Sequence, residues 1–276
     1  MDRSPAWKLD RHALSFRAFP GERGCVALFH GMLASHHYFS DALGSRLQPW
    51  RLLLPDLLGF GASAKPPVEF TLDDHLSCLA DLLEAEGSPA PLVLGGHSLG
   101  CLLATALAAR LPVGRVAGMV FFNYPRFTSP GLIHATLRNG SSHYRQATDG
   151  LGAPGHKELL DLSGDAVQQF ARLLPRSLQE EAIRTSPHSL AGTTRHCLFG
   201  YRPDPDLDTI ARLPMLFLLG GRDEVAPSSF IREREGDFPN ARWLFVEDAG
   251  HHLIHTDTEL ALRETAAFLD GLGGAC

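Results

Sequence analysis

The sequence is poor in the features that mark secreted, membrane-spanning or nucleic-acid-binding proteins. Its five cysteines are an odd number without a C-x-x-C pair, which favours reduced structural thiols over a disulfide framework or a zinc site. The most apolar helical stretch is interrupted at Arg110, well short of the roughly 20 residues that cross a bilayer. The net charge of -6 gives no electrostatic basis for binding nucleic acid or an anionic membrane. We therefore expect the partner to be a small molecule.

The amino terminus lacks the pattern of an export signal. Asp2 is acidic, and no apolar stretch follows it before Asp10, so we expect a cytoplasmic location. Neither internal repeats nor low-complexity tracts occur. With 276 residues, of which 44% are hydrophobic and 20% charged, the chain is long enough for one sizeable α/β domain, with or without an insertion.

Buried apolar runs alternate with helical patterns along most of the chain. Runs that fit strands covered on both faces occur at 25–29, 51–54, 91–95, 116–122, 215–219 and 242–246. Helical character occupies 37–47, 72–83, 99–110 and 258–272. Two short strands, at 6–10 and 14–19, favour an opening antiparallel hairpin. The alternation predicts an α/β fold with a mostly parallel central sheet flanked by helices.

The alternation stops between Tyr124 and Leu207. This stretch holds helical candidates at 157–162, 166–174 and 178–185 and no clear buried strand. We expect residues 1–123 and 208–276 to form the core of the fold, and residues 124–207 to form a helical cap inserted between two of its strands.

The turn from the fourth predicted strand into a helix has the pattern G-x-S-x-G, from Gly96 to Gly100. A serine on such a turn takes a strained backbone conformation that only small neighbours permit, and its hydroxyl stands above the edge of the sheet. A serine hydroxyl becomes nucleophilic when a base lies within hydrogen-bond reach and a third group orients that base. Ser98 is therefore the candidate nucleophile.

Partners for Ser98 follow two later strands. Asp223 comes just after the predicted strand that ends at Leu219, and His251 just after the one that ends at Val246. Parallel strands place their carboxyl ends at one edge of the sheet, where such sites form. We therefore predict Ser98 as nucleophile, His251 as base and Asp223 as the acid that orients it.

The tetrahedral intermediate of acyl transfer also needs donors for its negatively charged oxygen. The backbone N–H of Leu99 follows the nucleophile and begins a helix. The backbone N–H of Met32, after His30-Gly31, is the expected second donor.

Five motifs occur in order along the chain: His30-Gly31, D-x-x-G-x-G-x-S from Asp56 to Ser63, G-H-S-L-G around Ser98, G-G-R-D-E around Asp223 and Gly250-His251. With these motifs the sequence resembles the α/β-hydrolase superfamily, in its serine-nucleophile branch of esterases and carbon–carbon bond hydrolases. The resemblance implies the order Ser, Asp, His for the triad, and a reaction that needs neither a metal nor another cofactor. Cys101 departs mildly from the second glycine that many members carry after the motif.

Other acidic positions compete with Asp223. Glu224 is adjacent to it, and Asp248 lies near the base. Asn123 follows the strand that ends at Phe122, where some related enzymes carry the acid, but an amide cannot balance the charge of an imidazolium.

Other histidines compete with His251. His252 and His255 follow it closely, but the family pattern favours the histidine directly after glycine. His97, beside the nucleophile, is expected to be structural, and Asp56 is expected to stabilise its loop. The remaining histidines form no metal-binding pattern such as H-E-x-x-H.

A serine nucleophile argues against the epoxide hydrolases and haloalkane dehalogenases, which use an aspartate at that position. The leading expectation is a carboxylesterase-like hydrolase that acts through an acyl-enzyme. The alternatives are a carbon–carbon bond hydrolase, a biosynthetic cyclase or acyltransferase, and a ligand receptor on the same scaffold.

Aromatic and basic residues of the predicted cap are candidates for the substrate pocket. They are Phe127, His134, His143, Tyr144, Arg145, His196, Phe199 and Tyr201. A pocket-facing Arg126 or Arg145 would favour a substrate that carries a carboxylate.

Overall fold

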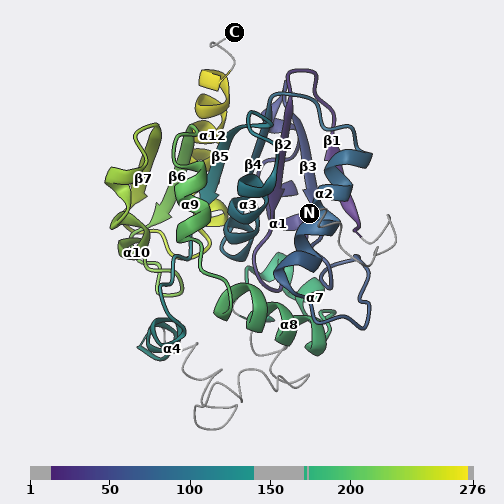
Figure 1. The fold of residues 1–276 in the computed structure, drawn as a ribbon, viewed down its shortest axis with the longest axis vertical. Helices are drawn as coiled ribbons and strands as arrows, with labels where there is room; N and C mark the ends of the chain where they lie inside the picture. Colours follow the sequence, from purple (N-terminus) through teal and green to yellow (C-terminus); the bar gives the residue numbers. More distant parts are fainter. Residues whose placement is uncertain (1–13, 140–170, 173, 273–276) are drawn as a thin grey trace, which may run out of the picture.

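The computed structural model describes residues 14–139, 171–172 and 174–272, which build a layered α/β structure (Figure 1). Its sheet has the strand order β1-β3-β2-β4-β5-β6-β7. Only β1 is antiparallel to its neighbour, and the other pairings are parallel. The strands are β1 (Phe16–Phe19), β2 (Cys25–Phe29), β3 (Arg51–Pro55), β4 (Leu92–His97), β5 (Val116–Phe122), β6 (Met215–Gly220) and β7 (Ala241–Val246). The predicted fold class is confirmed.

The opening strand pairs differently from a simple hairpin. β1 lies antiparallel to β3, with Phe16 opposite Pro55 and Phe19 opposite Leu52. The predicted strand at 6–10 lies outside the described residues. Every residue of β2, β4 and β6 is buried, which is why these segments are continuous apolar runs in the sequence.

Helices cover both faces of the sheet. The helices around the sheet are α1 (His37–Ser40), η1 (Gly44–Leu47), α2 (Leu72–Ala85), α3 (Leu99–Arg110), α9 (Asp204–Ile210), α10 (Ser228–Arg232), η4 (Glu235–Asp237), α11 (Leu253–Thr256) and α12 (Thr258–Leu272). α3 packs against α2, α9, β2 and β4, so nearly all of its side chains are buried. α12 packs against β5, β6 and η1. The helical stretch at 37–47 is divided into two short helices, because Gly44 has a positive φ of 37° that an α-helix does not allow.

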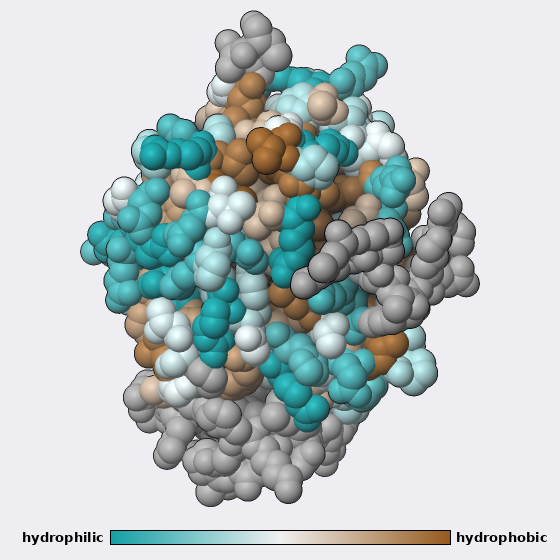
Figure 2. Space-filling model, viewed as in Figure 1, coloured by the Kyte–Doolittle hydropathy of each residue, from teal (hydrophilic) through white to brown (hydrophobic). Residues whose placement is uncertain are grey.

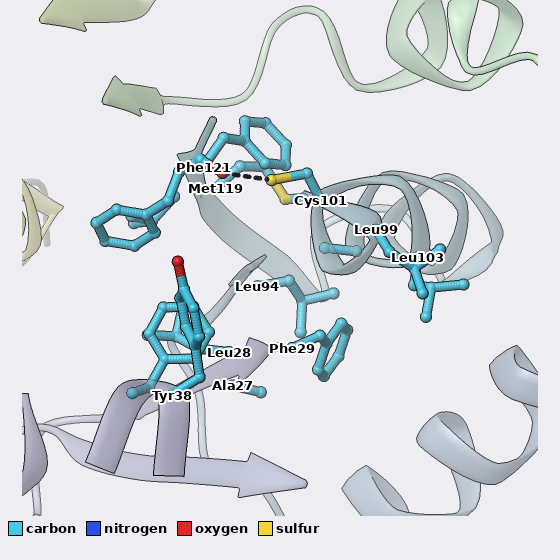
Figure 3. Close-up of a cluster of buried hydrophobic side chains, with 14 of the residues drawn as sticks. Ala27, Leu28, Phe29, Tyr38, Leu94, Leu99, Cys101, Leu103, Met119 and Phe121 are labelled. Atoms are coloured by element: carbon cyan, nitrogen blue, oxygen red, sulfur yellow. Dashed lines mark hydrogen bonds between the residues drawn. The ribbon is translucent and has the colours of Figure 1, made fainter. Parts of the chain in front are cut away.

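The core covers both faces of the sheet. Leu94 and Met119 are neighbours in register and share one face, whereas Leu28 points to the other; Leu99 and Leu103 of α3 belong to the same cluster (Figure 3). Close packing also sets local sequence: a Cβ on Gly95 would lie 2.0 Å from the carbonyl oxygen of Val120, so only glycine fits there.

The described helices of the predicted cap are α4 (Pro130–Asn139), α7 (Arg176–Ala182), α8 (Pro187–Thr193) and the π-helix η3 (Thr194–Phe199). They gather at the lower end of the molecule in Figure 1. The Ser189 hydroxyl donates a 2.8 Å hydrogen bond to the carbonyl oxygen of Gly59, which ties α8 to the loop after β3. The predicted boundary at residues 207–208 falls inside α9. The helical candidate at 157–162 lies outside the described residues, and so do residues 166–170 and 173 of the candidate at 166–174.

The face in Figure 2 is largely hydrophilic on the side of β7 and α10. Large apolar side chains that stand well exposed among the described residues are Phe16, Val113 and Ile183. Within the described ranges, no helix combines the length and apolar character that spanning a membrane requires.

A buried histidine on α2 makes the stability of the fold depend on pH. His75 is fully enclosed, and its Nε2 lies 3.1 Å from the Thr193 hydroxyl oxygen on α8. Burial, with a smaller contribution from the charge of His30, lowers the pKa of His75 from 6.5 to about 3. Between about pH 6.5 and pH 3, His75 is therefore protonated in the unfolded chain and neutral in the folded chain.

We expect the free energy of unfolding to fall by up to about 1.4 kcal/mol per pH unit as the pH drops below roughly 6.5, on account of His75. His75→Phe removes this contribution, so the variant should lose less stability between about pH 7 and pH 5 in urea denaturation. An equal loss in both proteins would contradict the assignment.

Candidate active site

The turn between β4 and α3 holds Ser98 in a strained conformation. Its φ of 51° and ψ of -119° lie outside the regions that residues other than glycine favour. A Cβ on Gly96 would lie 2.5 Å from the carbonyl oxygen of Phe29, and one on Gly100 only 1.9 Å from it. The two glycines of G-x-S-x-G therefore let the turn press against the end of β2, as the sequence predicts.

Asp223 and His251, predicted from separate strands, lie together. The Nδ1 atom of His251 is 2.9 Å from Oδ2 of Asp223. The other carboxylate oxygen of Asp223 accepts the backbone N–H groups of Val225 at 2.9 Å and Ala226 at 2.8 Å. Since Nδ1 of the neutral ring donates to the carboxylate, Nε2 is left as a proton acceptor. The pair thus has the geometry that the predicted roles of base and orienting acid require.

The Asp223 carboxylate is kept ionised although it is buried. Burial alone raises the pKa of this carboxyl, but the charge and hydrogen bond of His251, the Ala226 N–H and the Asn123 amide together bring its pKa below the ordinary 3.8. A negative charge beside His251 can therefore persist at neutral pH.

The competing acids are placed elsewhere or act differently. Glu224 is exposed, and the Asp248 side chain is 80% exposed and paired with Arg222. Asn123 hydrogen-bonds to the predicted acid and does not take its place: its Nδ2 donates to Oδ2 of Asp223 at 2.8 Å and to the carbonyl oxygen of Gly250 at 3.2 Å. This contact was not predicted from the sequence. The position of Asn123 directly after β5, at the same sheet edge as Asp223, is the feature of the sequence that could have indicated the contact.

The competing histidines contact Tyr38. Nδ1 of His252 lies 3.2 Å from the Tyr38 hydroxyl oxygen, and the His255 ring packs edge-on against the Tyr38 ring at 4.6 Å. Among the three neighbouring histidines, the one with a described hydrogen bond to Asp223 is His251.

The loop after β2 fixes the peptide that carries the Met32 N–H. The Leu57 N–H donates to Nε2 of His30 at 2.9 Å, so Nδ1 of His30 carries the proton and donates to the carbonyl oxygen of Gly31 at 2.7 Å. In a trans peptide the C=O and N–H point in opposite directions. The Met32 N–H is therefore directed away from His30.

The Gly31 end of this loop lies next to Ser98. A Cβ on Gly31 would lie 3.3 Å from the Cβ of Ser98. The N–H of Leu99 belongs to the first turn of α3, which leaves it without an intrahelical partner. Leu33 carries a positive φ of 63° in the same loop, a strained conformation of the kind that gathers at functional sites.

Asp56 stabilises the neighbouring loop, as expected. Its Oδ1 accepts the backbone N–H of His36 at 2.6 Å and lies 2.9 Å from Nδ1 of that ring. Its Oδ2 accepts the N–H of Ala62 at 2.8 Å, and the Ser63 hydroxyl donates to its carbonyl oxygen at 2.6 Å.

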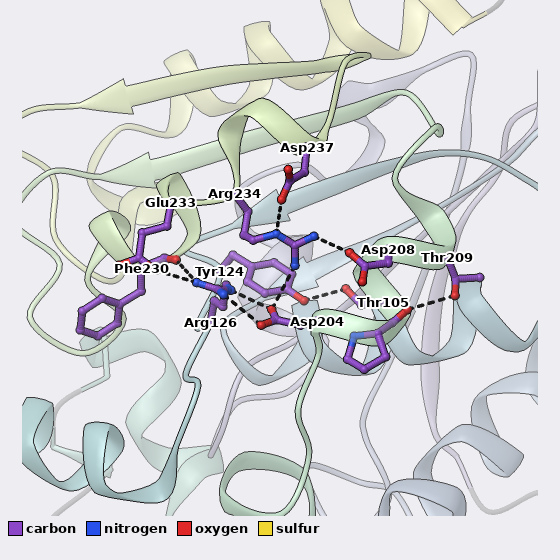
Figure 4. Close-up of polar contacts among 11 residues, drawn as sticks. Thr105, Tyr124, Arg126, Asp204, Asp208, Thr209, Phe230, Glu233, Arg234 and Asp237 are labelled. Atoms are coloured by element: carbon purple, nitrogen blue, oxygen red, sulfur yellow. Dashed lines mark hydrogen bonds and ion pairs between the residues drawn. The ribbon is translucent and has the colours of Figure 1, made fainter.

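Arg126 is occupied by protein partners (Figure 4). Its Nε and Nη2 donate to the two carboxylate oxygens of Asp204 at 2.7 and 2.9 Å. Its Nη1 donates to Glu233 at 2.9 Å and to the carbonyl oxygen of Phe230 at 2.8 Å. All three nitrogens of the guanidinium thus have partners in the protein, and Arg126 offers no support for a carboxylate-bearing substrate.

Two of the predicted pocket residues pack within the protein. Phe127 is buried with its ring 6.0 Å from that of Phe230, and the Tyr201 hydroxyl donates to Asp206 at 2.7 Å. His143, Tyr144 and Arg145 lie outside the described residues, as does the side chain of His134.

The remaining predicted pocket residues lie in η3, the π-helix. His196 is half-buried there, and its Nε2 lies 3.9 Å from a carboxylate oxygen of Glu69. Phe199 is also half-buried. η3 packs against α3, the helix that begins directly after Ser98.

The family model described as alpha/beta hydrolase fold matches residues 25–258. The chain belongs to this family. Lipase 3 of Moraxella sp. (strain TA144) is 24% identical to it over 256 residues, which cover 90% of this chain and 78% of the lipase. The magnesium-chelatase 30 kDa subunit of Rhodobacter capsulatus is 26% identical over 287 residues, which cover 92% and 86% of the two chains.

Solved structures share the same fold. An esterase from Thermogutta terrifontis superimposes with a TM-score of 0.71 at 23% identity, covering 94% of each chain. An esterase from Exiguobacterium antarcticum gives a TM-score of 0.74 at 15% identity, covering 93% of this chain and 95% of the esterase. Together with the sequence relatives, these proteins support a hydrolase of the alpha/beta fold.

The close contact between Gly31 and the His97 ring can be tested by adding a methyl group at Gly31. A Cβ there would lie 2.7 Å from Nδ1 of His97, a ring held on several sides, so Gly31→Ala should lower the free energy of unfolding by about 1–3 kcal/mol. Gly250→Ala is the control, because the nearest neighbour of its Cβ would be 4.0 Å away. Urea denaturation compares the variants, and equal stabilities would contradict the packing argument.

Proposed function

We propose that this protein is a serine hydrolase that cleaves a carboxylic ester of a small molecule through an acyl-enzyme on Ser98. The observation that carries the proposal is the 2.9 Å contact between Nδ1 of His251 and Oδ2 of Asp223, at the same sheet edge as the strained turn at Ser98. An oriented base near a serine on such a turn is what nucleophilic acyl transfer requires.

The proposed reaction has two halves. Ser98 Oγ attacks the ester carbonyl while Nε2 of His251 takes its proton and returns it to the leaving alcohol. Water then attacks the acyl-enzyme with the same base, and the acid product leaves. Asp223 holds the imidazole in the required tautomer, and the N–H groups of Met32 and Leu99 stabilise the oxyanion.

Two observations outside the site also favour ester hydrolysis. Named relatives include lipases and esterases, and their named activity fits a serine nucleophile. Arg126, which would have favoured a carbon–carbon hydrolase acting on a carboxylate-bearing substrate, is engaged by Asp204 and Glu233.

A second candidate is a role in a biosynthetic complex in which ester hydrolysis is not the task. The observation in its favour is the likeness to a protein named as a subunit of magnesium chelatase, which extends over 92% of this chain. Reactivity of Ser98 separates the two candidates, because an accessory subunit has no need of an activated serine.

The nucleophile is tested with a fluorophosphonate probe and a short p-nitrophenyl ester. We expect the purified protein to be labelled and to release a burst of p-nitrophenol, and we expect Ser98→Ala to abolish both. Absence of labelling and burst in the unaltered protein would reject the hydrolase. Labelling that survives Ser98→Ala would reject only the nucleophile.

The acid is tested by a pair of substitutions of the same type. Asp223→Asn removes the charge beside His251 and should reduce ester turnover by about 10⁴-fold, as in other triads. Asp248→Asn alters a side chain that is 80% exposed and should leave turnover unchanged. The opposite result would move the acid to Asp248.

A further inference from the structure

His97 joins the nucleophile turn to the loop of His251. It precedes Ser98 at the end of β4 and is fully buried, with its Nε2 2.7 Å from the carbonyl oxygen of His251. A carbonyl oxygen only accepts hydrogen bonds, so Nε2 of His97 carries the proton and donates. The two rings lie 4.7 Å apart between centroids.

The His97 ring is neutral and held in place. Burial is the largest cause that lowers its pKa well below 6.5, and the neighbouring His251, His252 and His255 lower it further. The Tyr38 ring stacks on it at 4.4 Å with an interplanar angle of 21°. Through the 3.2 Å contact with His252, Tyr38 also touches the residue after the base.

A second side chain from a neighbouring strand holds the same loop. Nδ2 of Asn123, directly after β5, donates to the carbonyl oxygen of Gly250 at 3.2 Å. Two successive carbonyl groups of the loop, those of Gly250 and His251, are therefore bound by side chains from the ends of β5 and β4.

We propose that His97 is a positioning residue for the proposed hydrolysis: its Nε2–H, bound to the His251 carbonyl, fixes the place of the base relative to Ser98. The inference rests on the proposed function for its kinetic consequence, but the hydrogen bond and its effect on His251 do not. Because His97 and Ser98 are adjacent in the chain, one short segment sets both the nucleophile and the support of the base. A shift of about 1 Å between reacting groups can cost about 10²-fold in rate.

A merely structural His97 would also be buried, so stability alone cannot identify the role. The informative variants keep or remove the donor at the place of Nε2. His97→Gln retains an N–H near that place, His97→Asn moves it toward the place of Nδ1, and His97→Phe keeps a ring against Tyr38 but has no donor. His75→Phe is the matched control, since His75 is another fully buried histidine, on α2 and outside the proposed machinery.

Two measurements are made on each variant. The first is kcat and KM for p-nitrophenyl butyrate. The second is the low-field NMR resonance of the His251 Nδ1 proton bound to Asp223, which can be observed whether or not the protein turns over an ester.

We expect His97→Phe and His97→Asn to lower kcat by about 10²-fold with little change in KM, and to shift or broaden the Nδ1 resonance. His97→Gln should keep the resonance and recover most of kcat, and His75→Phe should leave both unchanged. If His97→Phe does not fold, the comparison of His97→Asn with His97→Gln tests the positioning role.

The outcomes separate this inference from the proposed function. An active protein in which Asn and Gln at position 97 give equal kcat and an unchanged resonance overturns the positioning role and leaves the hydrolase intact. A protein inert to the ester whose resonance still depends on the donor at position 97 rejects the hydrolase and supports the positioning role.

Discussion

The close approach of β2 to the turn at Ser98 is the constraint on which the candidate site depends. The carbonyl oxygen of Phe29 lies where side chains on Gly96 or Gly100 would have to go, so the turn can be this tight only with glycine on both sides. That contact places the start of α3 and the loop after β2 side by side. Candidate nucleophile and candidate oxyanion donors therefore share one small region before any ligand is present, which is the preorganisation that electrostatic stabilisation needs.

Backbone strain is concentrated at the same edge of the sheet. Leu33, Ser98 and Asn123 follow β2, β4 and β5, and all three have a positive φ. Each such residue costs of order 1–3 kcal/mol, which the buried strands behind them offset by packing. A rigid parallel sheet with strained residues at its carboxyl end is the arrangement by which this fold holds a site steady.

Strands and helices could be predicted from the sequence better than the long-range contacts between them. Strand positions follow from local patterns, since buried parallel strands are uninterrupted apolar runs. Ser98, Asp223 and His251 could be proposed as a site from the sequence because each lies in a short motif directly after a predicted strand. The partners of Asn123, His97 and Arg126 lie from 78 to 154 positions away, and no pattern within a few residues encodes a contact at that range.

The bond between Arg126 and Asp204 bears on how the segment between them is attached to the core. Arg126 lies just after the chain leaves β5, and Asp204 lies where the chain enters α9. Their bidentate ion pair therefore joins the two ends of the segment between them. Between these two ends the chain also packs against the core, because Leu190 of α8 and Cys197 of η3 belong to the main hydrophobic cluster. The ion pair therefore holds both ends of the segment at one place on the core, independently of the contacts that α8 and η3 make farther along it.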